Sequence, residues 1–321
     1  MKGGITSRAE PLGDDRFAVE ADGRRVTISR PDRVLFPETG FTKGDLIDYY
    51  AAAGPWLLPH LEGRPLTLRR FPDGVDRPGF WEKRCPSHRP DWVAIAPLWS
   101  EVNEETIEYC VVEDVATLVW LGNLADVELH TLLARADRPE VPTALVFDLD
   151  PGAPAGLVEC AGIALCLRGV LASVGLECRP KASGGDGMQV YAPLNGEAGF
   201  ERTKPFAHAV ARAFEAELPD QVVSRMTKRL RRGKVLIDWS QNDHHKTTVC
   251  VYSVRARSEP RVSVPLEWEE VEAIAADREG RPRGFGPEEA LARLEERGDL
   301  FRPLLELRQD LPELDGVGGL A

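Results

Sequence analysis

The sequence has little of what marks membrane or secreted proteins. No stretch approaches the roughly 18 consecutive apolar residues that a membrane-spanning helix needs, and no apolar run follows a basic start as in a secretion signal. The 6 cysteines are scattered over 321 residues without a CxxC pair, which excludes a dense disulfide scaffold. We therefore predict a cytoplasmic protein with no membrane partner, whose thiols are reduced and mostly buried.

Positive charge and zinc-site spacing are also scarce. The formal net charge of −12 argues against a protein that coats nucleic acid over its whole surface. Basic residues are concentrated between Ser224 and Lys234, and acidic residues are dense from Glu267 onward. Cys85 and His88 have ligand-like spacing, but no second pair follows at the distance that a zinc site needs. Metal binding is therefore expected from carboxylates.

What is present is an alternation of apolar patterns that predicts an α+β protein, with antiparallel or mixed sheets flanked by helices. Residues 1–23 are polar and Gly-rich and are expected to form a flexible lead-in. An N-terminal α+β part follows over 24–140, where Thr42 caps a helix. Strands and helices then alternate regularly over 141–265, which we expect to be the catalytic core. The charged remainder, 266–321, is expected to form surface helices packed on that core.

Two aspartates end a buried strand in the segment ALVFDLDPG. Residues two apart on a strand point to the same face, so Asp148 and Asp150 project together. Like charges that close repel, and a divalent cation is the usual remedy, with hard oxygen ligands suited to magnesium or manganese. Asp238 ends another apolar strand, KVLIDWS, where a solitary buried carboxylate would be unfavourable. We therefore predict that the three aspartates bind two divalent ions, although aspartates at strand ends also serve as caps.

Two metal ions held in this way would suit phosphoryl transfer. Such ions lower the pKa of an attacking hydroxyl and neutralise the leaving pyrophosphate. The reaction also needs cations on the triphosphate. Arg231 and Lys234 precede Asp238, and Arg255 and Arg257 follow it. Each of these could instead be a solvated surface charge, but together they favour a nucleotidyltransferase.

Several ordered motifs together resemble a known family. They are VFDLDPG, the Gly-rich SGGDGMQVYAPL, and KVLIDWSQN followed by KTT and YSVRAR, with RPDRVLFPETGFTKGDLIDYY and RRFPDGVDRPGFWEKR in the N-terminal part. From about Val26 to Pro265 the chain resembles the polymerase domain of bacterial ligase D, within the archaeo-eukaryotic primase superfamily. The resemblance implies a primase-polymerase catalytic core with a small N-terminal α+β unit that binds DNA ends.

The resemblance also assigns roles to matching residues. Asp148, Asp150 and Asp238 match the family's metal ligands, and His130 matches a histidine beside the incoming nucleotide. Positions that hold the nucleotide are matched by Ser183, Gln189, Arg231, Lys234, Gln241, Arg255 and Arg257. Positions that bind DNA are matched by Arg33 and Lys43, which contact the 5′-phosphate of an end, by Phe80 and Trp81, which stack where the template turns, and by Arg70. Cations suit the phosphate, and rings suit an unpaired base.

A few positions depart from the family pattern. The family has Lys and His where this sequence has Asp186 and Gln189, which removes positive charge from the triphosphate pocket and predicts weaker or more metal-dependent catalysis. Arg30 stands where the family has Asn. The resemblance further implies Mn2+ or Mg2+ as cofactor, ribo- or deoxynucleoside triphosphates as substrates, and attack of a primer 3′-hydroxyl on the α-phosphorus.

The resemblance places the chain in DNA repair. Because the sequence stops at Ala321, we expect a stand-alone, nucleoid-associated polymerase that acts on DNA ends with a 5′-phosphate. Ku and a separate DNA ligase are the expected protein partners, since many relatives carry the ligase on the same polypeptide.

Three other functions fit part of the pattern. A strand-end DxD also occurs in aspartyl phosphatases, which hydrolyse phosphomonoesters, but the later motifs would then be unexplained. A non-catalytic end-binding module would keep the 5′-phosphate pocket while Asp186 and Gln189 abolish nucleotide transfer. A replicative primase would start chains without a primer. The presence of all three carboxylates favours the end-joining polymerase.

Overall fold

The structure is a computed structural model that describes residues 4–101, 103–277 and 284–313, and the chain folds into two compact units. Unit 1 consists of Met1–Leu132, Val249–Val262 and Phe285–Asp299; unit 2 consists of Leu133–Thr248, Ser263–Gly284 and Leu300–Ala321. The chain therefore passes between the units several times, and neither unit coincides with the linear parts expected from the sequence. No described helix is both long enough and apolar enough to cross a bilayer.

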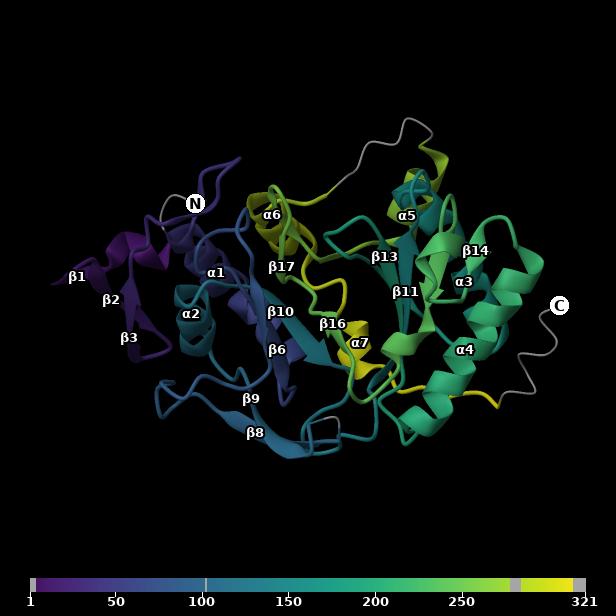
Figure 1. Cartoon of the computed structure of the whole chain (residues 1–321), viewed down its shortest axis with the longest axis horizontal. Coiled ribbons are helices and arrows are strands. Elements are labelled where there is room, and N and C mark those ends of the chain that lie inside the picture. The colour runs from purple at the N-terminus through teal and green to yellow at the C-terminus, as the bar shows by residue number, and fades with distance from the viewer. Residues whose placement is uncertain (1–3, 102, 278–283, 314–321) are drawn as a thin grey trace. The chain divides into compact units, whose positions relative to one another are not determined.

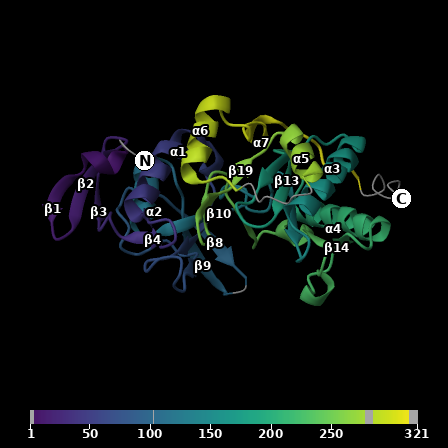
Figure 2. The same cartoon turned by 90° about the horizontal axis from the view of Figure 1, so that it is seen from above.

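Unit 1 begins with a small antiparallel sheet of β1 (Glu10–Gly13), β2 (Arg16–Ala21) and β3 (Arg24–Ser29), in that order. The flexible lead-in expected over 1–23 is therefore wrong for most of this stretch. Val19 of β2 lies opposite Val26 of β3, and both are buried where the sheet packs on α2 (Val115–Asn123) (Figure 1 and Figure 2). The alternation of buried and exposed residues in β2 is short and follows a polar turn, so the sequence pattern did not reveal this strand.

The long helix of unit 1, α1 (Lys43–Leu61), begins at the cap that the sequence predicts. Thr42 Oγ1 accepts a hydrogen bond from the Asp45 amide at 3.1 Å, and Asp45 Oδ2 accepts one from the Thr42 amide at 2.8 Å. The helix is anchored to a neighbouring strand by Tyr50, whose hydroxyl donates to the Val127 carbonyl at 2.8 Å. The start of α1 is thereby fixed in position.

The larger sheet of unit 1 has the strand order β16-β10-β6-β9-β8, with β7 paired to β6. Its strands are β6 (Leu66–Arg70), β7 (Phe80–Glu82), β8 (Ile95–Ser100), β9 (Glu105–Cys110), β10 (Asp126–Leu132) and β16 (Thr247–Val249), the last of which ends in unit 1. Two short pairs, β4 (Val34–Phe36) with β5 (Phe41–Thr42) and β17 (Val254–Ala256) with β18 (Pro260–Val262), also belong to this unit. Every residue of β10 is buried, so β10 is the centre of the core here.

The expectation that all cysteines are thiols is wrong for one pair. Cys85 and Cys110 form a disulfide across 25 residues, with Cα atoms 4.7 Å apart. The Cys85 amide donates to the Glu108 carbonyl at 2.7 Å, which holds the segment after β7 alongside β9. The contact depends on strand placement, which cysteine spacing does not reveal. Of the other cysteines, Cys160, Cys178 and Cys250 are buried and Cys166 is exposed.

The helices after residue 266 do not all pack on unit 2, which contains most of the core expected to be catalytic. In unit 2, α5 (Trp268–Ala276) packs on α3 (Leu157–Ser173), and α7 (Pro303–Glu306) lies beside the strand β13 (Met188–Pro193). By contrast, α6 (Pro287–Arg297) packs on α1 and β18 in unit 1 (Figure 1). The expectation of one C-terminal helical segment on the core is therefore wrong for α6.

Unit 2 is built on a sheet with the strand order β14-β15-β11-β13-β12-β19. The strands are β11 (Ala144–Pro151), β12 (Arg179–Ala182), β13 (Met188–Pro193), β14 (Val222–Val223), β15 (Val235–Asp238) and β19 (Val264–Pro265), and α4 (Phe200–Glu217) packs beside β14 and β11. All pairs are antiparallel except β14 with β15. β11 is central because its run Ala144–Phe147 is fully apolar and buried.

Candidate functional site

Strand pairing in unit 2 brings the three predicted aspartates to one face of the sheet. Asp148 of β11 lies opposite Asp238 of β15, and Asp150 is two residues further along β11. Directly opposed residues in antiparallel strands have side chains on the same face, as do residues two apart on one strand. The sequence could place Asp148 and Asp150 together, but only the β11–β15 register places Asp238 beside them.

The negative charge of this aspartate site is poorly balanced. Burial, followed by the charges of Asp150 and Asp238, raises the pKa of Asp148 to about 7, and a Gln189 hydrogen bond and the Lys181 charge act in the opposite direction. Carboxylates that repel in this way are stabilised by a divalent cation, and their hard oxygen atoms suit Mg2+ or Mn2+. The donor set therefore fits a metal site.

The Asp238 carboxylate is held in position by residues that follow it. Asp238 Oδ1 accepts hydrogen bonds from the Ser240 amide at 2.9 Å and from Ser240 Oγ at 2.6 Å. Gln241 Nε2 donates to Asp238 Oδ2 at 2.8 Å. Gln241, which the resemblance assigns to the triphosphate, is thus engaged with a predicted metal ligand in this structure.

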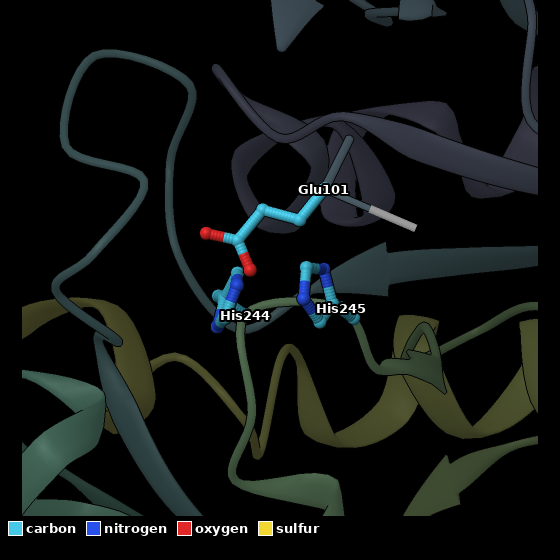
Figure 3. Close-up of side chains that lie close together, drawn as sticks. All are labelled: Glu101, His244 and His245. Atoms are coloured by element: carbon cyan, nitrogen blue, oxygen red, sulfur yellow. The ribbon is translucent and has the colours of Figure 1, made fainter. Parts of the chain in front are cut away.

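The loop after Gln241 is fixed on β11 and leads to two histidines. The buried Asn242 pairs with both backbone groups of Val146, accepting from its amide at 2.9 Å and donating to its carbonyl at 2.7 Å. Asp243 then forms an ion pair with Lys204 of α4. The rings of His244 and His245 follow, with centroids 3.6 Å apart (Figure 3).

The Gly-rich turn between β12 and β13 packs directly on the aspartate strand. A Cβ atom on Gly187 would lie 2.1 Å from the Leu149 carbonyl oxygen, so only glycine fits there. Ser183 Oγ closes the turn by donating to the Gly187 carbonyl at 3.0 Å and accepting from the Gly185 amide at 3.1 Å. Asp186 is exposed at its tip.

Gln189, one of the departures from the family pattern, lies inside the site. It is buried, and its Cα partner on β11 is Asp148. Its Oε1 accepts a hydrogen bond from the Tyr191 hydroxyl at 3.3 Å, and its side chain hydrogen-bonds Asp148. Gln189 therefore orients a predicted metal ligand through hydrogen bonds rather than by charge.

The basic segment reaches the same end of the sheet by a close backbone contact. The Gly152 amide donates to the Lys234 carbonyl at 2.8 Å, and a Cβ on Gly152 would lie 1.9 Å from the Arg231 carbonyl oxygen. Because Gly152 comes two residues after Asp150, this contact holds Arg231 and Lys234 near the aspartate strand. The Arg231 guanidinium donates to the Met226 carbonyl at 2.8 Å, and Lys234 Nζ donates to the Pro219 carbonyl.

In unit 1, two predicted nucleotide-binding residues meet at a buried glutamate. Glu128 Oε2 lies 2.8 Å from His130 Nε2 and 3.3 Å from Arg255 Nε, and Arg69 lies 3.0 Å from Glu128 Oε1. Burial alone would raise the pKa of Glu128, but the His130 hydrogen bond and the Arg255 charge lower it to about 2. Glu128 therefore stays ionised and holds its partners. Arg257, the other predicted triphosphate residue here, is exposed.

The predicted template-binding aromatics lie at this glutamate network. Phe80 and Trp81 of β7 are 45% and 54% exposed. The Trp81 ring packs edge-on to His130, with centroids 4.8 Å apart, and the Arg69 guanidinium lies over the same ring at 5.3 Å. Arg70, also predicted to bind DNA, is paired with Glu82 at 2.9 Å and lies over the Phe80 ring at 5.4 Å. Arg70 thus supports an exposed ring.

A second cluster in unit 1, at the start of α1, joins the predicted end-binding cations. Lys43 is 4% exposed, and its Nζ donates to Asn123 Oδ1 at 3.1 Å and to Ser29 Oγ at 3.3 Å. Burial and the charges of Arg30 and Arg33 lower the pKa of Lys43 to about 8. Like charges gathered around a helix N-terminus are the arrangement expected for binding an anion.

The residues that sequence reasoning missed are mainly supporting ones. Glu128 and Asn123 contact predicted site residues, and Lys181 is buried beside the aspartate site. The VELH motif contains Glu128, so a charged residue two positions before His130 was an available signal. Lys181 and Asn123 gave no such signal, because their partners lie on other strands and helices.

Comparison with known proteins identifies the family. The family described as LigD, primase-polymerase domain, matches residues 42–301. The LigD protein of Mycobacterium tuberculosis, described as a multifunctional non-homologous end joining DNA repair protein, is 37% identical over 292 residues, which cover 88% of this chain and 37% of that protein. The bifunctional LigD protein of Bacillus subtilis is 30% identical over 289 residues, covering 90% of this chain and 45% of that protein. The chain thus spans less than half the length of these relatives.

A solved structure is similar over nearly its full length. The polymerase domain of Mycobacterium tuberculosis ligase D in complex with DNA aligns with a TM-score of 0.81 and 36% identity, covering 89% of this chain and 99% of that one. The α+β primase-polymerase fold expected from the sequence is therefore confirmed. This chain belongs to the LigD primase-polymerase domain family.

Proposed function

We propose that this chain is a template-dependent nucleotidyltransferase that fills or extends DNA ends in non-homologous end joining. Membership of the LigD primase-polymerase family supports the reaction class. The observation that carries the proposal is the placement of Asp148, Asp150 and Asp238 on one face of the sheet of unit 2. Clustered aspartates of this kind suit phosphoryl transfer, which depends mainly on charge neutralisation and positioning.

The three aspartates would hold two divalent ions, Mn2+ or Mg2+. When bound, such ions lower the pKa of the primer 3′-hydroxyl and neutralise the charge of the leaving pyrophosphate. The chain's own residues orient the ligands: Gln189 hydrogen-bonds Asp148, and Ser240 hydrogen-bonds Asp238. The residues proposed to contact a nucleoside triphosphate are Ser183, Arg231, Lys234, Gln241, His130, Arg255 and Arg257.

DNA ends are proposed to bind to unit 1. Lys43, Arg33 and Arg30 would receive the 5′-phosphate, because three cations at the start of α1 favour an anion there. The exposed rings of Phe80 and Trp81 would stack on template bases, with Arg70 as their support. Association with Ku, sealing by a separate ligase and a place in the cytoplasm near the nucleoid remain predictions.

Primer extension tests the proposal. We expect the protein to extend a labelled primer on a gapped template with Mn2+ and either ribo- or deoxynucleotides, and to do so better when the downstream strand carries a 5′-phosphate. The double variant Asp148→Asn, Asp150→Asn should lose at least about a thousandfold in extension, since it removes groups that contact the metal ions. The control Asp220→Asn, which changes an exposed aspartate of the same unit, should extend normally. An active double variant would refute the site assignment.

One observation favours a second candidate, a non-catalytic DNA-end binding module. The cation cluster around Lys43 does not depend on the aspartates, so end binding could persist without nucleotide transfer. Tight binding that depends on the 5′-phosphate, combined with no extension under any metal or nucleotide, would favour this module. Extension that starts without a primer would favour a replicative primase, and hydrolysis of a simple phosphomonoester would favour a phosphatase.

A further inference from the structure

A buried lysine lies in line with the aspartate site across four strands of unit 2. Lys181 of β12 is the Cα partner of Gln189, Gln189 is the partner of Asp148, and Asp148 is the partner of Asp238. Directly opposed residues of antiparallel strands share a face. The row Lys181, Gln189, Asp148 and Asp238 therefore places one cation on the face that carries the carboxylates.

The surroundings of Lys181 keep its charge away from solvent. The residue is 1% exposed, and its Nζ lies 5.3 Å from the centroid of the Tyr191 ring. The Tyr191 hydroxyl donates to Gln189 Oε1 at 3.3 Å and also hydrogen-bonds the Thr248 hydroxyl at 3.0 Å, which fixes the ring against which the ammonium lies. A buried ammonium is unfavourable without negative charge nearby. The aspartates supply that charge.

We propose that Lys181 is a built-in counter-charge of the aspartate site, which offsets part of the repulsion among the carboxylates and weakens the site's affinity for a divalent cation. The inference rests on the proposed metal site. Lys181 is 1% exposed, and we assign it an effect through Asp148, which makes it a positioning residue. Its electrostatic effect on Asp148, which opposes that of the other aspartates, agrees with this role.

The charge of Lys181 determines whether it raises or lowers the affinity for a divalent ion. A divalent ion at the aspartates and the Lys181 ammonium repel each other, whereas the ammonium and the carboxylates attract. Lys181 and Asp148 are two strand spacings apart, roughly 10 Å between their backbones. Removal of the ammonium should therefore tighten Mn2+ binding by about tenfold in a partly buried site. A residue that only filled space would leave the affinity unchanged or weaken it.

The experiment is a titration of the whole chain with Mn2+ at pH 8.5, in which free Mn2+ is followed by electron paramagnetic resonance. Lys181→Met and Lys181→Gln should bind Mn2+ about tenfold more tightly than the wild type, and Lys181→Arg, which keeps the charge, should bind within about twofold of it. Lys83→Met is the control, because it removes an exposed lysine of unit 1 to which no binding role is assigned, and it should leave the affinity for Mn2+ unchanged. Extension should also reach half its maximum at a lower Mn2+ concentration in Lys181→Met.

The Mn2+ titration distinguishes failure of the proposed metal site from failure of the proposed role of Lys181. A wild type that binds no Mn2+ through Asp148 would overturn the metal site and this inference with it. If the wild type binds Mn2+ and the affinities of Lys181→Met and Lys181→Gln lie within twofold of its affinity, the proposed role of Lys181 is wrong but the metal site stands. If both variants lose the cooperative thermal transition, Lys181 is needed for the folding of unit 2. That result would also overturn the proposed role of Lys181.

Discussion

The clearest prediction concerns Lys43 and the pH dependence of end binding. The pKa of Lys43 lies at about 8, so the side chain is about nine-tenths protonated at pH 7 and about one-tenth protonated at pH 9. A bound 5′-phosphate favours the protonated form and raises the pKa of Lys43, so binding is strongest below pH 8 and weakens as pH rises above it. The affinity for the phosphate should therefore fall about tenfold between pH 7 and pH 9.

Substitution of Lys43 removes both the contact and its pH dependence. A charge-assisted hydrogen bond contributes about 1.5–3 kcal/mol, so Lys43→Met should weaken phosphate-dependent binding by about 10- to 150-fold at pH 7. What affinity remains depends on Arg30 and Arg33, so the change in affinity between pH 7 and pH 9 should drop below about twofold. Lys43→Arg should likewise bind without the decline at high pH.

The assay is fluorescence anisotropy with a recessed duplex, with and without a 5′-phosphate, at several pH values. The ratio of the two dissociation constants removes the general attraction of the protein for DNA. Arg138→Met, which removes an exposed cation paired with Glu197 in unit 2, is the control and should behave as the wild type. A Lys43→Met protein with the wild-type ratio and the wild-type pH dependence would refute the placement of the phosphate.

Two further predictions concern the glutamate network of unit 1. Glu128→Gln removes a buried carboxylate that holds Arg69, His130 and Arg255, and it should lower the free energy of unfolding by about 3–5 kcal/mol in urea titration. Glu105→Gln, which breaks an exposed pair with Arg84, should change the free energy of unfolding by less than about 1 kcal/mol. If Glu128→Gln and Glu105→Gln changed the free energy of unfolding equally, the proposed network around Glu128 would be contradicted. Trp81→Ala should weaken binding to a gapped template by about 1–3 kcal/mol in anisotropy, while Trp99→Ala, another exposed tryptophan, should not; equal affinities would exclude stacking on Trp81.

Much of the aspartate strand β11 could be predicted from the sequence because the signals are local. The apolar run before Asp148 indicates a buried strand, and period-two geometry puts Asp148 and Asp150 on one face whatever the rest of the fold does. The cap at Thr42 is likewise a property of four consecutive residues. The ordered motifs then carried the family resemblance, which the comparisons confirmed.

Other features were wrong or missed because they depend on contacts between distant segments. The Cys85–Cys110 disulfide needs the segment after β7 to lie on β9, and α6 joins unit 1 because its apolar side packs on α1. Short amphipathic segments such as β2 and α6 carry no information about which surface will bury them. Their partners are chosen by the packing of the whole unit.

Patterns along the sequence were enough to predict the family, the strand with Asp148 and Asp150, and the residues proposed to bind metal, phosphate and bases. The tertiary structure decided which of these residues meet: the register between β11 and β15 brings Asp238 opposite Asp148, and Glu128 joins His130 to Arg255. It also put Lys181 in the row of the aspartate site. The physical reason is that strand register and helix packing are set by burial across the whole unit, whereas the sequence pattern fixes only how each segment faces its own core.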